Sequence, residues 1–188
     1  MKIRKSCLIL ILLLAFLVWP HSGRAEEAHL SDIVVTNTRD HLLLYFSVND
    51  CFTPELNQAI ESGINTSFTF FVELFEKRDL LWDKKIADRE ISHSIKYDNL
   101  KEIYEVRLSE KGNKAVVVKD FDEAKKLMSE VVALEVSSLN RLRKGGHYRI
   151  RMMAELDKIK LPFYLHYVLF FLSLWDFETD WYTVDFRY

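Results

Sequence analysis

Histidine and cysteine are the residue types in this chain that could bind a metal or carry catalysis. Residues 26–188 contain His29, His41, His93, His147, His166 and Cys51. None of the histidines has the close spacing, such as HExxH, that brings two ligands to one metal ion. His93 alternates with Ile91 and Ile95, which favours a core or cross-strand histidine over a ligand. The sequence therefore names no catalytic residue, no metal site and no cofactor.

Cys51 is the one candidate nucleophile. It precedes a predicted helix start at Thr53, where a helix dipole can lower the pKa of a thiol. A hydrolase that uses Cys51 with a nearby histidine is therefore one functional hypothesis. However, no known nucleophile signature surrounds Cys51, and a lone cysteine is commonly a buried apolar side chain. The sequence therefore favours a protein without enzymatic activity and leaves an enzyme as an alternative.

The densest basic cluster, Arg141–Arg151, precedes the most aromatic segment, Leu161–Trp175. Cations beside aromatic side chains are typical of proteins that bind a membrane interface. We predict an interaction patch formed by Arg149, Arg151, Lys158, Lys160, Phe163, Tyr164, Tyr167, Phe170, Phe171 and Trp175. The alternative is that the aromatic side chains belong to the core and the arginines to a solvated strand face. The segment is shorter than the roughly 20 residues that cross a bilayer.

A tyrosine corner is predicted at residues 142–148. Leu142, the glycines Gly145 and Gly146, and Tyr148 at the start of an alternating strand have the spacing of this motif. In immunoglobulin-like proteins, the tyrosine hydroxyl hydrogen-bonds to the backbone a few residues upstream. Glycines suit such a corner because they adopt φ > 0 without steric cost. The alternative is an ordinary turn into a hairpin strand.

Alternation of apolar and polar residues predicts a mainly β protein. We expect strands over 33–37, 41–48, 67–75, 91–97, 104–108, 115–118, 131–136 and 148–156. For residues 131–136 a helix is the alternative. Capping signals at Thr53 and Asp120 predict two short helices over 54–63 and 121–130. The predicted fold is a single antiparallel β-sandwich, immunoglobulin-like, with about eight or nine strands.

Two further features concern the predicted loops and the last strand. Leu80-Leu81-Trp82 is expected to cover the core from a loop or to extend a strand, because large apolar residues are usually buried. The alternation changes register at Trp181-Tyr182, which predicts a bulge in the last strand.

Residues 1–25 have the three regions of a secretory signal peptide. A basic start at Lys2–Lys5 precedes the apolar run Leu8–Trp19, and small residues stand at 23 and 25, before a cut ahead of Glu26. The apolar run is short for a membrane span, so we favour a cleaved signal over an uncleaved anchor. We expect export to the periplasm or to the periplasmic face of a membrane, and one domain over 26–188.

The composition of residues 26–188 excludes some classes of function. These residues include 22 basic and 28 acidic side chains, a net charge of −6. This balance argues against general nucleic-acid binding, which needs a basic surface. Cys51 has no second cysteine to pair with, so stability must come from the core.

Spaced aromatic and aliphatic residues run from about Ile33 to Tyr188: Tyr97–Leu100, Tyr104–Val106, Phe121, Ala124, Leu142, Tyr148, Leu156, Leu161-Pro162, Trp175 and Trp181-Tyr182. This pattern resembles that of an uncharacterised bacterial envelope family, domain of unknown function 4390. Asp180 departs from the family, which usually has a small residue there. The resemblance implies an exported protein with no assigned reaction. Its relatives are often encoded near membrane sensor kinases, which implies such a kinase as a candidate partner.

Three functions follow, in order of preference. The first is a non-catalytic binding or accessory module that acts through protein contacts at the periplasmic side of a membrane. The second is a membrane-surface or lipid-interacting protein that uses segment 161–175, since one strand could not bury so many apolar residues. The third is the Cys51 hydrolase.

Overall fold

The computed structural model describes residues 27–157 and 178–188. These residues form nine β-strands in two antiparallel sheets, two α-helices and two 3-10 helices. The mainly β class predicted from the sequence is confirmed. The predicted signal peptide, residues 1–25, and the aromatic segment 161–175 lie outside the described residues. None of the described helices is long and apolar enough to cross a membrane.

The smaller sheet has the order β1-β2-β7, with β1 (His29–Asn37), β2 (His41–Asn49) and β7 (Glu130–Ser138). The larger sheet has the order β6-β5-β4-β3-β8-β9. Its strands are β3 (Thr66–Glu76), β4 (Lys84–Asp98), β5 (Ile103–Leu108), β6 (Ala115–Val118), β8 (His147–Leu156) and β9 (Tyr182–Arg187). The helices are α2 (Pro54–Glu61), α3 (Phe121–Ser129), η1 (Ser109–Lys111) and η2 (Leu139–Arg141).

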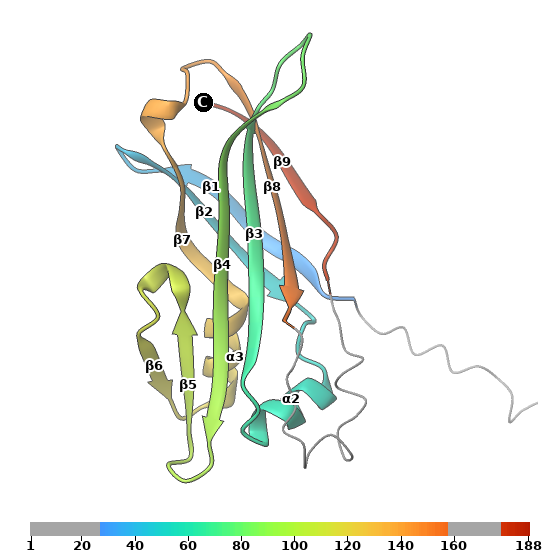
Figure 1. Cartoon of the computed structure of the whole chain (residues 1–188), viewed down its shortest axis with the longest axis vertical. Coiled ribbons are helices and arrows are strands. Elements are labelled where there is room, and N and C mark those ends of the chain that lie inside the picture. Colours follow the sequence, from blue (N-terminus) through green and yellow to red (C-terminus); the bar gives the residue numbers. More distant parts are fainter. Residues whose placement is uncertain (1–26, 158–177) are drawn as a thin grey trace, which may run out of the picture.

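The two sheets face each other across one hydrophobic core. Side chains alternate along a strand, so each sheet directs every second residue inward. β2 buries Leu42, Leu44, Phe46 and Val48, and β3 buries Phe68, Phe70, Val72 and Leu74. The rings of Phe46 and Phe70 meet edge-to-face across the core, 5.7 Å apart. Figure 1 shows the smaller sheet crossing behind β3, β4 and β8.

Both helices begin where the capping signals predict. Thr53 Oγ1 accepts a hydrogen bond from the backbone of Leu56, and the Asp120 carboxylate accepts one from Glu123. Residues 131–136 belong to β7, as we predicted in preference to a helix.

An irregularity in pairing lies directly before the last strand, next to the position Trp181-Tyr182 where we predicted a bulge within it. Glu155 of β8 pairs with Glu178, whereas Met152 pairs with Tyr182. Tyr182 is four positions after Glu178, whereas Met152 is three positions before Glu155. The segment between Glu178 and Tyr182 therefore has one more residue than the part of β8 opposite it, as in a β-bulge.

Two expectations about the β3–β4 connection were wrong. β4 begins at Lys84 rather than at residue 91, because the long strand β3 pairs with it as far as Glu76. Leu80, Leu81 and Trp82 neither cover the core nor extend a strand. They lie exposed in the loop between β3 and β4, which extends past the ends of the neighbouring strands (Figure 1).

Candidate functional site at the hairpin end

Tyr148 fixes the loop between β7 and β8. The backbone N–H of Arg143 donates a 2.7 Å hydrogen bond to Oη of Tyr148, whose side chain is buried. The tyrosine corner predicted from the sequence is therefore confirmed. Gly146 makes room for it, because a Cβ at this position would lie 2.8 Å from the Tyr148 ring and 2.9 Å from the carbonyl oxygen of Arg143.

Polar bonds join this loop to the β3–β4 hairpin. Oε1 of the buried Glu76, at the end of β3, accepts hydrogen bonds from the Arg143 guanidinium, including one of 2.9 Å from Nε. The hydrogen bond with Glu76 raises the pKa of Arg143. The guanidinium of Arg141 donates to the carbonyl of Ile86, and the backbone of Lys77 donates to that of His147. The hairpin and the loop therefore form one unit.

We call this unit the hairpin end and define it as residues 76–85 and 139–146. An open pocket of about 650 Å³ lies within it. The pocket is lined by charged and aliphatic side chains: Glu76, Arg78, Asp79, Leu80, Leu81, Lys84, Ile86, Arg141 and Arg143.

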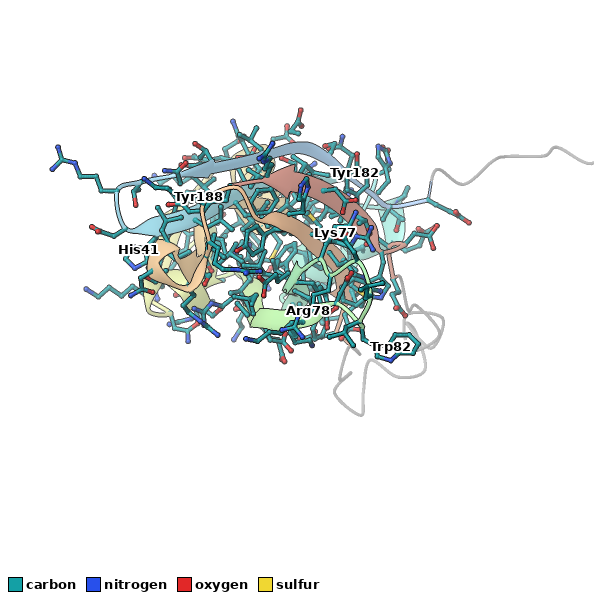
Figure 2. The ribbon with its side chains drawn as sticks, turned by 90° about the horizontal axis from the view of Figure 1, so that it is seen from above. His41, Lys77, Arg78, Trp82, Tyr182 and Tyr188 are labelled. Carbon is teal, nitrogen blue, oxygen red and sulfur yellow. The ribbon has the colours of Figure 1, made fainter. Side chains whose placement is uncertain are left out.

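The tip of the hairpin is apolar and exposed. Leu80, Leu81 and Trp82, which we call the apolar tip, are 96%, 67% and 94% exposed. In Figure 1 the hairpin extends beyond the neighbouring strands, and Figure 2 shows Trp82 pointing away from the sheets. Three consecutive large apolar side chains that face water are unusual unless another molecule covers them.

The hairpin end is also basic. It contains seven basic residues and three acidic ones, a net charge of +4, whereas the rest of residues 26–188 has a net charge of −10. The side chains of Arg78 and Lys84 form no hydrogen bond or ion pair with other residues that the structure describes. The site can therefore attract a negatively charged surface while presenting apolar side chains to it.

Several residues that carry the family resemblance pack together at the other end of the larger sheet. The ring of Tyr97 in β4 lies 4.6 Å from that of Tyr104 in β5, which stacks 5.0 Å from Phe121 of α3. Ala124 is buried beside them in the core. These residues pack β4, β5 and α3 together, so this part of the pattern reflects the fold.

A family model described as Domain of unknown function (DUF4390) matches residues 25–185. The chain belongs to this family. No curated protein and no solved structure matches the chain. The family expected from the spaced aromatic and aliphatic residues is therefore confirmed, and its name assigns no activity.

Two members of the patch predicted from the sequence lie on the outer face of β8. Arg149 bonds Asp185 at 2.8 Å and lies 3.6 Å from Asp83. Arg151 lies 3.7 Å from Glu73 and stacks on the ring of Trp181. Acidic neighbours thus compensate both arginines. The rest of the patch, which comprises Lys158, Lys160 and the six aromatic residues Phe163, Tyr164, Tyr167, Phe170, Phe171 and Trp175, lies outside the described residues.

The sequence prediction missed the apolar tip and the two unpaired cations beside it, Arg78 and Lys84. A signal was present, because Asp79 and Asp83 flank the three apolar residues and interrupt any strand alternation. Aspartate is rare in strands and common in turns, so an aspartate on each side of a short apolar run favours a loop.

Cys51 has the environment of an unreactive thiol. It is 2% exposed, and its Sγ lies 3.4 Å from the carbonyl oxygen of Val48. Burial raises the pKa of Cys51 to about 12, so the thiol is neutral near pH 7. Because the thiolate is the reactive form, these observations argue against a hydrolase that uses Cys51.

His93 is a core histidine, as its alternation with isoleucines predicted. Its ring is buried, with Nδ1 3.0 Å from the carbonyl oxygen of Met128 and Nε2 3.2 Å from Oε1 of Glu110. The imidazole therefore links β4 to α3 through Met128 and to η1 through Glu110. Within residues 27–157 and 178–188, no group of three or more potential ligands is arranged for a metal ion.

Proposed function

We propose that this protein is an exported, non-catalytic binding module that docks at the periplasmic side of a membrane through its hairpin end. The exposed apolar tip on a basic end of the molecule carries the proposal. A surface with both properties gains free energy by leaving water and by meeting negative charge. The tyrosine corner and the Glu76–Arg143 pair hold the site in place for a partner.

We infer that the architecture is an immunoglobulin-like sandwich of the variable type. The order β1-β2-β7 corresponds to strands A, B and E, and the order β4-β3-β8-β9 corresponds to C′, C, F and G. Tyr148 stands near the start of the strand that corresponds to F, where a tyrosine corner occurs in such domains. In this interpretation the hairpin end consists of the C–C′ and E–F loops. The fold by itself carries no function, so the site carries the proposal.

Export rests on the signal-peptide pattern of residues 1–25, which leaves residues 26–188 as one domain. We expect the protein isolated from the envelope fraction to begin at Glu26. Mass spectrometry that finds an intact N-terminus on cytoplasmic protein contradicts this part of the proposal.

Site-specific photocrosslinking in living cells tests the docking function. A photoreactive residue at position 81 samples the apolar tip, and one at position 100 is the matched control, because Leu100 is 97% exposed at the other end of β4. We expect crosslinks to a membrane component at position 81 and none at position 100. Equal crosslinking at the two positions, or none at either, overturns the proposal.

A further inference from the structure

We propose that the hairpin end binds the surface of a bilayer that contains anionic phospholipid, with the apolar tip inserted among the headgroups. This inference rests on the docking function proposed above and names the partner. It differs from the sequence-based hypothesis of a lipid-binding segment at 161–175, because it uses other residues and another part of the fold.

The apolar tip has the composition of an interfacial anchor. Tryptophan and leucine partition into the boundary between headgroups and acyl chains, where the indole retains a polar contact. Leu80 and Trp82 are almost fully exposed and are consecutive with Leu81, so all three enter such a boundary together. No strand or helix of the described residues covers them.

The charge around the tip favours lipid headgroups as the occupant. Arg78 and Lys84 stand within two residues of the tip on either side, and Arg141 and Arg143 line the pocket beside it. Phosphate groups in a bilayer form a continuous negative surface, which matches cations placed on both arms of a hairpin. A positive end of this size attracts such a surface before contact.

The opposite end of the molecule is acidic, so the protein is expected to approach an anionic bilayer with its hairpin end first. Residues 49–65 and 97–103, which we call the α2 end, include one basic and five acidic residues, a net charge of −4. The two ends lie at opposite ends of β4, whose 15 residues span about 50 Å at roughly 3.3 Å per residue. Screening limits electrostatic interactions to about 8 Å at physiological salt. The bilayer therefore attracts the hairpin end and repels an approaching α2 end.

Vesicle flotation with the protein purified in the form that the cells produce tests the inference. The probes are vesicles of phosphatidylglycerol mixed with phosphatidylcholine and vesicles of phosphatidylcholine alone. We expect flotation with the anionic vesicles that weakens as salt is raised, and at least tenfold weaker partitioning to the neutral ones. No flotation with the anionic vesicles overturns the inference.

The apolar contribution is tested with the variant Leu80→Ser/Leu81→Ser/Trp82→Ser. We expect at least tenfold weaker partitioning. The matched control, Leu100→Ser, removes an equally exposed leucine from the α2 end and leaves partitioning unchanged. Thermal melting of each variant checks that it is folded. Equal flotation of the triple variant and the unmodified protein assigns binding to other residues, such as 161–175, and overturns the inference.

The charge contribution is tested with Arg78→Gln/Lys84→Gln. Both side chains lack an ion pair among the described residues, so their replacement breaks none. We expect about 25-fold weaker partitioning at low salt, from about fivefold for each cation at the surface. The control Lys114→Gln/Lys119→Gln removes two exposed lysines from the strand β6 region, with no effect on partitioning.

The flotation and crosslinking results separate the two proposals. If a protein is crosslinked at position 81 but the unmodified protein does not float with anionic vesicles, lipid is not the partner. Docking through the hairpin end then still holds. Failure of both experiments overturns both proposals.

Discussion

The hairpin end and the α2 end of the molecule differ in charge, in exposed apolar surface and in how they are held. The hairpin end has a net charge of +4 and exposes three consecutive large apolar residues. The α2 end has a net charge of −4, and Leu100 is its one exposed large apolar residue among those described. A Cβ on Gly63 after α2 would lie 3.0 Å from Asn99 of the β4–β5 turn, so this end is also one packed unit.

The bonds that hold the two ends differ in burial. At the hairpin end, the hydroxyl of Tyr148 and the carboxylate of Glu76, both on buried residues, accept hydrogen bonds from Arg143. At the α2 end, Thr53 caps the helix, and the Asp98 carboxylate accepts bonds from the backbone of Leu100 and Lys101 near the surface. The backbone bond from Lys101 lowers the pKa of Asp98. Buried bonds cost more to lose, so we expect the hairpin end to be the less tolerant of substitution.

The largest effect is expected from Gly146→Ala. The new Cβ would lie within 3 Å of the Tyr148 ring and of backbone, which must shift, so we expect a loss of about 2–3 kcal/mol in the free energy of unfolding. Gly112→Ala is the control, because no atom lies within 4 Å and only its positive φ costs about 1 kcal/mol. Urea unfolding measures both, and equal losses contradict the packing argument.

Tyr148→Phe removes the hydroxyl of the tyrosine corner and leaves the N–H of Arg143 without its partner. We expect a loss of about 1–2 kcal/mol. Tyr104→Phe at the other end of the larger sheet is the matched control, since its hydroxyl has no hydrogen bond among the described residues. Chemical denaturation of both variants makes the comparison. If Tyr104→Phe costs as much, the corner does not stabilise the hairpin end.

Thr53→Ala tests the α2 end. Loss of the bond from Leu56 N–H to Thr53 Oγ1 is expected to cost about 1 kcal/mol, as for other helix caps. Thr53→Ser keeps the hydroxyl and is expected to restore most of the stability. Thermal unfolding measures the difference, and a loss larger than that of Gly146→Ala reverses the order of the two ends.

The smallest effect is expected from Asp185→Asn. Hydrogen bonds from Arg149 and Lys77 hold the pKa of Asp185 well below its usual range. Its folded pKa is thus below the unfolded value of about 3.9, so its stabilisation is complete above about pH 5 and is lost as the pH falls. We expect the variant to be less stable at pH 7 and the difference to shrink below pH 4. A constant difference across this range in acid titrations contradicts the assignment.

Local signals made part of this structure predictable. Thr53 and Asp120 bond the backbone three residues away, and Tyr148 bonds it five residues away, so the responsible residues stand close together in the sequence. The bulge before Tyr182 was visible for the same reason, as a change in alternation.

Apart from the aspartates that flank the apolar tip, the hairpin end had no local signal, because it depends on the pairing of residues that are distant in the sequence. The length of β4 is set by its pairing with β3, because five of the first seven residues of β4, from Lys84 to Glu90, are charged and only Ile86 and Ala87 are apolar. Residues 76–85 and 139–146 are more than fifty positions apart, so their combined charge becomes visible only in the fold. The expectation that Leu80, Leu81 and Trp82 cover the core or extend a strand rested on residue type alone. Residue type indicates how often a side chain is buried, but not which side chains surround it in a given fold.

The pairing of the central hairpin has a mechanical consequence. A pull on the apolar tip along the strands moves β3 and β4 together, so the load falls on their outer partners. β3 pairs with β8 from Phe68 to Glu76, and β4 pairs with β5 from His93 to Asp98. These ladders are loaded in shear, in which many hydrogen bonds must break at once, rather than one after another as in unzipping. The hairpin can therefore transmit force from its tip to the core of the protein without separating from the sheet.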